Sequence, residues 1–213
     1  MKTEDLIGML AKGAVAVDAH AAQRRYTMAI SAGTMAAVVM LLSLLHVRPD
    51  LAGAAVSPLF WIKPVFVASL AAASLLAALR LSRPGASVAW IPGAIAAPVL
   101  IIWTIAAITL LDVDPVERTR LFFGETWKSC PFLIAMLSVP MFVAVIWAMQ
   151  GLAPTRLRLA GFAAGLLAGA TAALVYCLHC PEIEAPFVGF WYLLGMLIPA
   201  GVGAALGPSL LRW

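Results

Sequence analysis

Charged residues are scarce in this chain of 213 residues, where Asp, Glu, Lys and Arg together make up 11%. A soluble domain carries about a quarter charged residues and is about half apolar, whereas 63% of these residues are hydrophobic. The mean hydropathy is +1.00. This composition excludes a water-soluble domain as the bulk of the protein and indicates that lipid is its main solvent.

The chain also lacks a polar stretch in which a soluble domain of about 50 residues could fold. The longest polar segment between apolar runs is Asp112 to Ser129. A cleavable signal peptide is absent as well, because charged residues interrupt the amino-terminal segment before Arg24 and Arg25. These residues are Lys2, Glu4, Asp5, Lys12 and Asp18. We therefore expect residues 1–25 to remain in the mature protein as a cytoplasmic segment, followed by a membrane domain over residues 26–213.

Six apolar runs have about the 20 residues that a helix needs to cross a hydrocarbon core. They are Tyr26 to Leu45, Phe60 to Leu79, Trp90 to Leu111, Cys130 to Met149, Leu159 to Leu178, and Phe187 to Leu210. Each run predicts a helix, because lipid cannot satisfy free backbone groups and the runs lack the alternation of barrel strands. The predicted fold class is all-α, an integral membrane bundle of six transmembrane helices.

Basic residues are distributed unequally between the two sides of this bundle. One side holds both termini and the second and fourth loops, with Lys2, Lys12, Arg24, Arg25, Arg80, Arg83, Arg156, Arg158 and Arg212. The other side holds Arg48, Lys63, Arg118, Arg120 and Lys128. By the positive-inside rule the richer side is cytoplasmic, so both termini are predicted to lie inside. The net charge of +4 is then a topology signal and does not argue for direct nucleic-acid binding.

Glycines recur at four-residue spacing in the last two runs. Gly161, Gly165 and Gly169 lie in the fifth run, and Gly203 and Gly207 in the sixth. Small residues at this spacing let two helix backbones approach closely in a membrane. The pattern predicts tight packing of the fifth helix, with the sixth as a candidate partner.

Two of the three cysteines, Cys130 and Cys180, lie at the outer ends of the fourth and fifth runs, and each precedes a proline. The short inner loop makes these helices antiparallel neighbours of similar length, so both cysteines reach the same membrane level. A disulfide persists outside the cytoplasm, and a thiol at a helix amino terminus is biased towards thiolate. The pair is therefore a candidate redox sensor, whereas Cys177 is interpreted as buried apolar filler.

A soft-metal site is a second interpretation of the same region. Thiolate and imidazole suit zinc, copper or cadmium, and the candidate ligands are Cys130, Cys180, His179 and Glu182. No permanent cofactor is expected. We rank transient metal capture below thiol oxidation, because adjacent side chains such as His179 and Cys180 need not point the same way.

Two rival functions lack the residues that they need. A membrane thiol oxidoreductase needs two cooperating cysteine pairs and a quinone site, and three cysteines cannot supply the pairs. A small transporter usually buries ionisable groups at mid-depth, whereas the charge near a span, Lys63, lies close to its outer end. The sequence accordingly does not indicate an enzyme.

The amino-terminal segment has an apolar stripe at helical spacing. The stripe contains Leu6, Ile7, Leu10, Ala14 and Val17, and the charged residues stay off it. Such a stripe predicts an amphipathic helix. A helix that lies on the inner leaflet would carry a basic polar face, but the first turn here is acidic. We favour a helix that fits a groove on a partner protein, with Leu6, Ile7, Leu10 and Val17 as anchors.

Several short motifs together make the chain similar to a known family. They are the start Met1-Lys2-Thr3-Glu4-Asp5-Leu6-Ile7, Trp127-Lys128-Ser129-Cys130-Pro131, Leu152-Ala153-Pro154-Thr155, His179-Cys180-Pro181-Glu182, and the ending Gly207-Pro208-Ser209-Leu210-Leu211-Arg212-Trp213. The chain resembles the NrsF family of bacterial membrane anti-sigma factors over its whole length.

The resemblance implies a regulator that holds an extracytoplasmic-function (ECF) sigma factor at the bacterial inner membrane. Cys130 and Cys180 match the outward-facing cysteine positions of the family, whereas Cys177 has no counterpart there and receives no role. We expect the amino-terminal segment to bind the sigma factor and the outer cysteines to report oxidative or heavy-metal stress. The oligomeric state stays open, and a homo-oligomer is compatible with the sequence.

Overall fold

A computed structural model describes residues 3, 8, 20–83 and 85–212. Within these residues the chain forms helices and no strand. The main helices are α2 (Ala21–Leu44), α4 (Pro58–Leu81), α5 (Ile91–Leu111), α7 (Cys130–Gln150), α8 (Leu157–Tyr176) and α10 (Leu193–Leu210). Short α9 (Ala185–Phe187) and the π-helical turn η1 (Val188–Tyr192) continue directly into α10.

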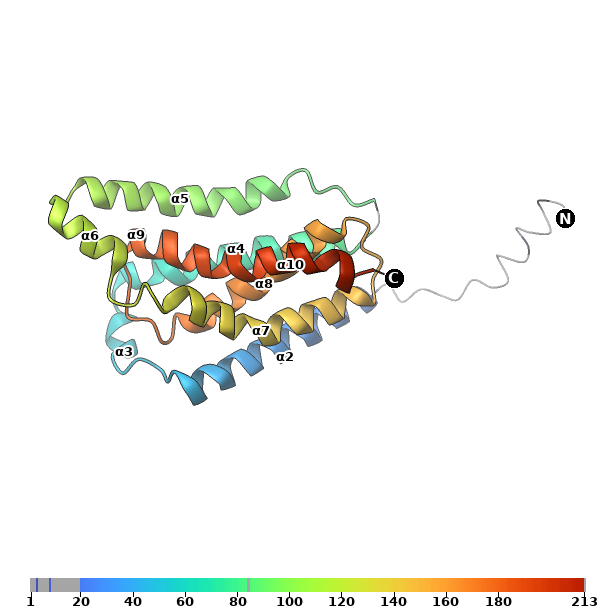
Figure 1. Cartoon of the computed structure of the whole chain (residues 1–213), viewed down its shortest axis with the longest axis horizontal. Coiled ribbons are helices and arrows are strands. Elements are labelled where there is room, and N and C mark those ends of the chain that lie inside the picture. Colours follow the sequence, from blue (N-terminus) through green and yellow to red (C-terminus); the bar gives the residue numbers. More distant parts are fainter. Residues whose placement is uncertain (1–2, 4–7, 9–19, 84, 213) are drawn as a thin grey trace.

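The six predicted spans are confirmed. Among the described residues, six helices are long and apolar enough to cross a membrane, with the last running over Ala185–Leu210. The helices lie side by side along one axis, and α2 begins at the same end of the bundle at which α10 ends (Figure 1). Proline stands in the first turn of five helices, where its missing N–H costs nothing. These prolines are Pro58, Pro92, Pro115, Pro131 and Pro186.

Two short helices occupy loops in which the sequence analysis placed no element. They are α3 (Leu51–Ala54) and α6 (Pro115–Phe123), both at the end of the bundle opposite the start of α2 (Figure 1). Helix α6 carries mixed charge and one apolar edge. The ring of Phe122 packs against Trp191 with centroids 6.1 Å apart, so α6 lies on the end of the last span.

Helix α8 is the centre of the bundle. Of the 18 residues that make up its apolar stretch, 83% are buried, compared with 11% for the corresponding stretch of α5. It packs against α10, α4, α7 and α2, whereas α5 lies along the outside (Figure 1). The large apolar side chains that α5 leaves exposed face the position of lipid in a membrane, where exposure costs little.

The glycine faces meet as predicted. A Cβ on Gly161 would overlap the carbonyl oxygen of Gly203, and one on Gly203 would overlap that of Gly161. One turn further along α8, a Cβ on Gly165 would overlap the carbonyl oxygen of Pro199. The α8 and α10 backbones are therefore in direct contact, and a β-carbon at these positions would push them apart.

Replacing Gly165 by alanine should destabilise the bundle by about 1–3 kcal/mol, because the added methyl group overpacks a backbone contact. The matched control is Gly201→Ala on α10, where nothing lies within 4 Å of the new Cβ. Thermal unfolding of the purified protein in detergent measures both variants. Equal unfolding temperatures for the two variants would contradict the close α8–α10 contact.

Candidate functional site

The two outer cysteines meet at one end of the bundle. Cys130 is the first residue of α7, and Cys180 belongs to the segment 177–184 between α8 and α9, which we call the cysteine loop. Both side chains are completely buried and both are free thiols. Both belong to one buried cluster, and the two thiols are close enough to influence each other's ionisation. The expectation that they reach the same level and approach each other is confirmed.

A buried lysine of α4 is hydrogen-bonded to the backbone of the cysteine loop. Lys63 of α4 is fully buried, and its Nζ donates to the carbonyl oxygens of Cys180 at 2.9 Å and Glu182 at 2.7 Å. The same ammonium lies 5.3 Å from the ring centroid of Tyr192. The Arg48 side chain, 8% exposed, also reaches this loop and donates from its Nη1 to the Cys180 carbonyl oxygen at 3.3 Å. Lys63 therefore places a positive charge beside the two thiols.

Lys63 was expected only near the outer end of a span, and its part in the site was not predicted. The missed signal is a lysine inside the apolar run of α4, since a charge there faces the protein interior far more often than lipid. Tyr192, in η1, was missed as well. Its hydroxyl lies beside the thiols of Cys177 and Cys180, and it is the one buried polar side-chain atom of the described part without a well-formed hydrogen bond.

The surroundings shift the pKa values of Cys177 and Cys180 in opposite directions. The hydrogen bond from Cys130 and the charge of Lys63 lower the pKa of Cys180 to about 6, against the opposing effect of burial. Burial raises the pKa of Cys177 to about 12, and its Sγ donates to the carbonyl oxygen of Ala173 at 3.2 Å. Because the thiolate is the nucleophile, these pKa directions favour Cys180 over Cys177 as the candidate nucleophile.

The cysteine loop is tied to neighbouring loops by polar contacts. The Arg48 backbone N–H donates to the Leu178 carbonyl at 3.0 Å, and Nδ1 of His179 lies 2.9 Å from the His46 carbonyl oxygen. From the other side, the Glu125 N–H donates to Oε1 of Glu182 at 2.8 Å. The loops after α2 and before α7 thus both rest on the segment that carries Cys180.

These contacts bear on the candidate metal ligands. The side chains of His179 and Glu182 bond to backbone groups of different loops, so they do not converge with the Cys130–Cys180 pair. No group of three or more His, Cys, Asp or Glu side chains in the described ranges is arranged to hold a metal. Of the four proposed ligands, the fold brings together the two thiols.

The predicted partner-binding residues Leu6, Ile7, Leu10 and Val17 lie outside the described residues. The amphipathic amino-terminal helix therefore stays a prediction from the sequence. The described chain starts its first long helix, α2, at Ala21.

A family described as NrsF, negative regulator of sigma F, matches residues 10–213. The chain belongs to the NrsF family. The resemblance predicted from the cysteine motifs and the chain ends is thereby confirmed, and it extends across the whole membrane bundle. No solved structure matches the chain.

Two NrsF relatives match from end to end. The chain is 65% identical over 213 residues to the probable anti-sigma-F factor NrsF of Azospira oryzae, which covers 100% of both chains. It is 41% identical over 216 residues to the anti-sigma-F factor NrsF of Caulobacter vibrioides, again over 100% of both chains. Both relatives carry names of regulatory proteins and neither is named as an enzyme.

Proposed function

We propose that this protein is a membrane-bound anti-sigma factor that holds an ECF sigma factor through residues 1–25 and releases it when Cys130 and Cys180 are oxidised. The observation that carries the sensing part is the proximity of two buried thiols in one cluster, beside the Lys63 ammonium that binds the Cys180 carbonyl oxygen. The family match supports the regulatory part. The charge distribution supports an inner-membrane protein with both termini in the cytoplasm and the cysteine loop outside.

The proposed oxidation uses a hydroperoxide as the two-electron oxidant. The Cys180 thiolate attacks the peroxide, so an S–O bond forms, the O–O bond breaks, and the departing oxygen leaves protonated as water or alcohol. The Cys130 thiol then attacks the Cys180 sulfur and loses its proton, the S–S bond forms, and the departing hydroxide takes up that proton as water. Two thiols lose two electrons and two protons, and one hydroperoxide is reduced.

Two helices join the thiol pair to the start of α2. Helix α4 carries Lys63 near one end, and Ser82, the residue directly after its other end, is hydrogen-bonded to the Tyr26 hydroxyl at 2.8 Å. Helix α7 begins at Cys130 and carries Trp147 in its last turn, 5.5 Å from the Arg25 guanidinium. Disulfide formation that shifts α7 against α4 would therefore reach Arg25 and Tyr26, next to the sigma-binding segment.

The energetics require a bundle with two nearly balanced packings. Turning a 1:99 population into 99:1 takes about 5.5 kcal/mol of differential interaction. A disulfide typically contributes about 2–4 kcal/mol. The proposed switch therefore starts from a resting packing that is favoured only modestly over the released one.

The test is to oxidise membranes that contain the full-length protein and its sigma factor with hydrogen peroxide, then follow two quantities in one sample. Free thiols are counted by maleimide labelling after acid quench and denaturation, and the sigma factor is measured by co-purification. We expect loss of two thiols together with most of the bound sigma factor. Cys130→Ser and Cys180→Ser should block release, and Cys177→Ser is the matched control that should behave as wild type. If the sigma factor leaves while both thiols stay reduced, the cysteines are structural and the sensor lies elsewhere.

Capture of a soft metal by the two thiolates is the second trigger, because cadmium prefers sulfur ligands. The same assay separates the two triggers. Release by cadmium should be reversed by a chelator and release by peroxide by a dithiol reductant. Cadmium release that survives in Cys130→Ser would remove the thiol pair from metal sensing.

A further inference from the structure

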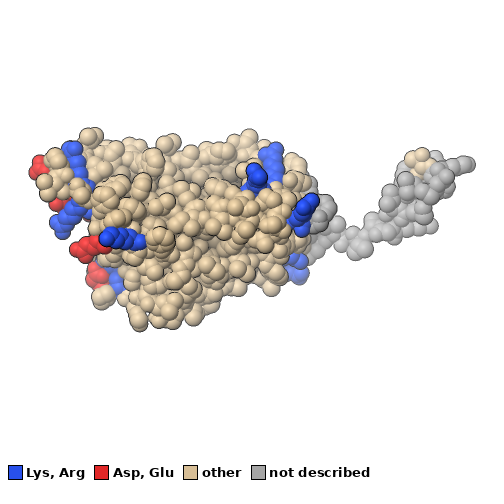
Figure 2. All heavy atoms as spheres, viewed as in Figure 1, with Lys and Arg blue, Asp and Glu red and all other residues tan. Residues whose placement is uncertain are grey.

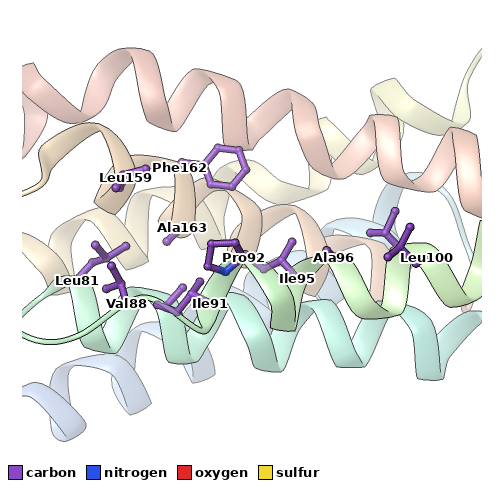
Figure 3. A pocket seen from close by; sticks show the side chains of 12 residues that line it. Leu81, Val88, Ile91, Pro92, Ile95, Ala96, Leu100, Leu159, Phe162 and Ala163 are labelled. Carbon is purple, nitrogen blue, oxygen red and sulfur yellow. The ribbon is translucent and has the colours of Figure 1, made fainter.

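An apolar groove of about 430 Å³ lies between α5, α8 and the end of α4. Side chains of α5, including Ile95, face Phe162 and Ala163 of α8 across it (Figure 3). Along α5 the lining runs from Ile91 to Leu100, which is about 14 Å at the helical rise. That length is roughly half of a hydrocarbon core of about 30 Å, the depth of one lipid leaflet.

A basic pocket of about 200 Å³ continues the groove at the end of the bundle where α4 ends. The two hollows share Leu81 and Val88. The pocket is lined by the three arginines Arg80, Arg83 and Arg156, which come from the end of α4, the loop after it and the residue before α8. A charged hollow thus opens directly into an apolar one.

Nothing in the described part of the chain neutralises these arginines. Its ion pairs are Arg48–Asp50 and Arg120–Glu117, both at the other end. The visible acidic side chains gather at that other end, whereas basic side chains stand without them where α4 ends (Figure 2). Three guanidinium groups around one small pocket match the charge and the fork geometry of a phosphate.

We propose that this composite hollow binds an anionic phospholipid, with the headgroup phosphate between Arg80, Arg83 and Arg156 and one acyl chain in the groove beside α5. Basic pockets between membrane helices commonly recognise acidic headgroups. The one-leaflet length of the groove and its direct opening into the basic pocket favour a lipid over free phosphate, which would leave the apolar part empty. A lipid bound there would bridge the end of α4, next to Ser82, and the residue before α8, and Ser82 is the hydrogen-bond partner of Tyr26.

Native mass spectrometry of the full-length protein, taken from vesicles of equal phosphatidylglycerol and phosphatidylcholine, tests the headgroup contact. Each lost arginine should weaken retention of phosphatidylglycerol by about fivefold. The double variant Arg80→Gln/Arg156→Gln should therefore lose about 25-fold. Arg158→Gln/Arg212→Gln removes the same charge outside the pocket and should change retention less than twofold. Equal retention of the two lipids by the wild type, or equal losses in both double variants, would overturn the proposal.

The groove is tested with two exposed neighbours on α5. Ala96 lines the groove and Ala97 does not. Ala96→Trp should displace phosphatidylglycerol, whereas Ala97→Trp should retain it at the wild-type level. Addition of inorganic phosphate at millimolar concentration should leave retention unchanged in the wild type. Displacement by phosphate alone would indicate a simple anion site, and a protein dimer that is lost in Ala96→Trp would indicate a second copy of the chain in the groove. Either result would overturn the proposal.

Discussion

Replacing Lys63 by methionine should slow disulfide formation between Cys130 and Cys180 at pH 7 severalfold. Methionine keeps much of the side-chain length but removes the ammonium that stabilises negative charge at Cys180. The pKa of Cys180 should then rise from about 6 towards the ordinary thiol value of 9.0. Because a thiolate performs the attack, the rate at neutral pH falls with the thiolate fraction.

The sign of the pH dependence makes this prediction specific. In the wild type the oxidation rate should rise as pH increases through about 6 and level off near neutrality, because Cys180 is then largely deprotonated. In Lys63→Met the midpoint should move to higher pH. The measurement is the initial rate of thiol loss with hydrogen peroxide between pH 5 and 9, followed by maleimide shift after denaturation.

The matched control is Lys128→Met. Lys128 is exposed at the same end of the bundle and lies 5.4 Å from the ring centroid of Trp127, so this variant removes an equal charge outside the site. It should keep the wild-type pH profile. Thermal unfolding of Lys63→Met shows whether the bundle survives the loss of the two hydrogen bonds from the Lys63 ammonium, since a hydrogen bond from a charged group contributes about 1.5–3 kcal/mol. A folded Lys63→Met protein with an unchanged midpoint would remove Lys63 from thiol activation.

Replacing Leu10 by aspartate should release the sigma factor without any oxidant and leave its target genes constitutively active. Leu10 lies on the predicted apolar stripe with Leu6 and Val17. A carboxylate placed in an apolar groove stays unpaired and desolvated, and loss of a buried anchor typically costs about 2 kcal/mol or more. Co-purification should therefore fall by roughly thirtyfold or more.

The control for charge alone is Ala16→Asp, which puts the same carboxylate outside the predicted apolar stripe. It should retain the sigma factor. A reporter gene under the sigma factor measures the same contrast in cells. If Leu10→Asp and Leu6→Asp both co-purify the sigma factor at the wild-type level, the amino-terminal segment is not the binding element.

Much of the cysteine site could be predicted from the sequence. Equal helix lengths and a short connecting loop placed Cys130 and Cys180 at one level, and the structure brings their thiols together. The loop contacts of Glu182 and His179 could not be predicted, because they depend on where Glu125 and His46 lie in space. The low pKa of Cys180 could not be predicted either, because it depends partly on Lys63 lying on the buried face of α4.

The amino-acid sequence alone was enough to predict the six spans, the unequal basic charge of the two sides, the close-packing glycine face of α8 and the family. Each follows from a local property: lipid demands long apolar helices, and small residues permit backbone contact. Which side of each helix is buried is visible only in the folded bundle. In a membrane the lipid-facing side is as apolar as the core, so α5 and α8 look alike as sequences although one is peripheral and the other central. For the same reason, the sequence did not predict that Lys63 lies beside the thiols or that the arginine pocket is continuous with the apolar groove.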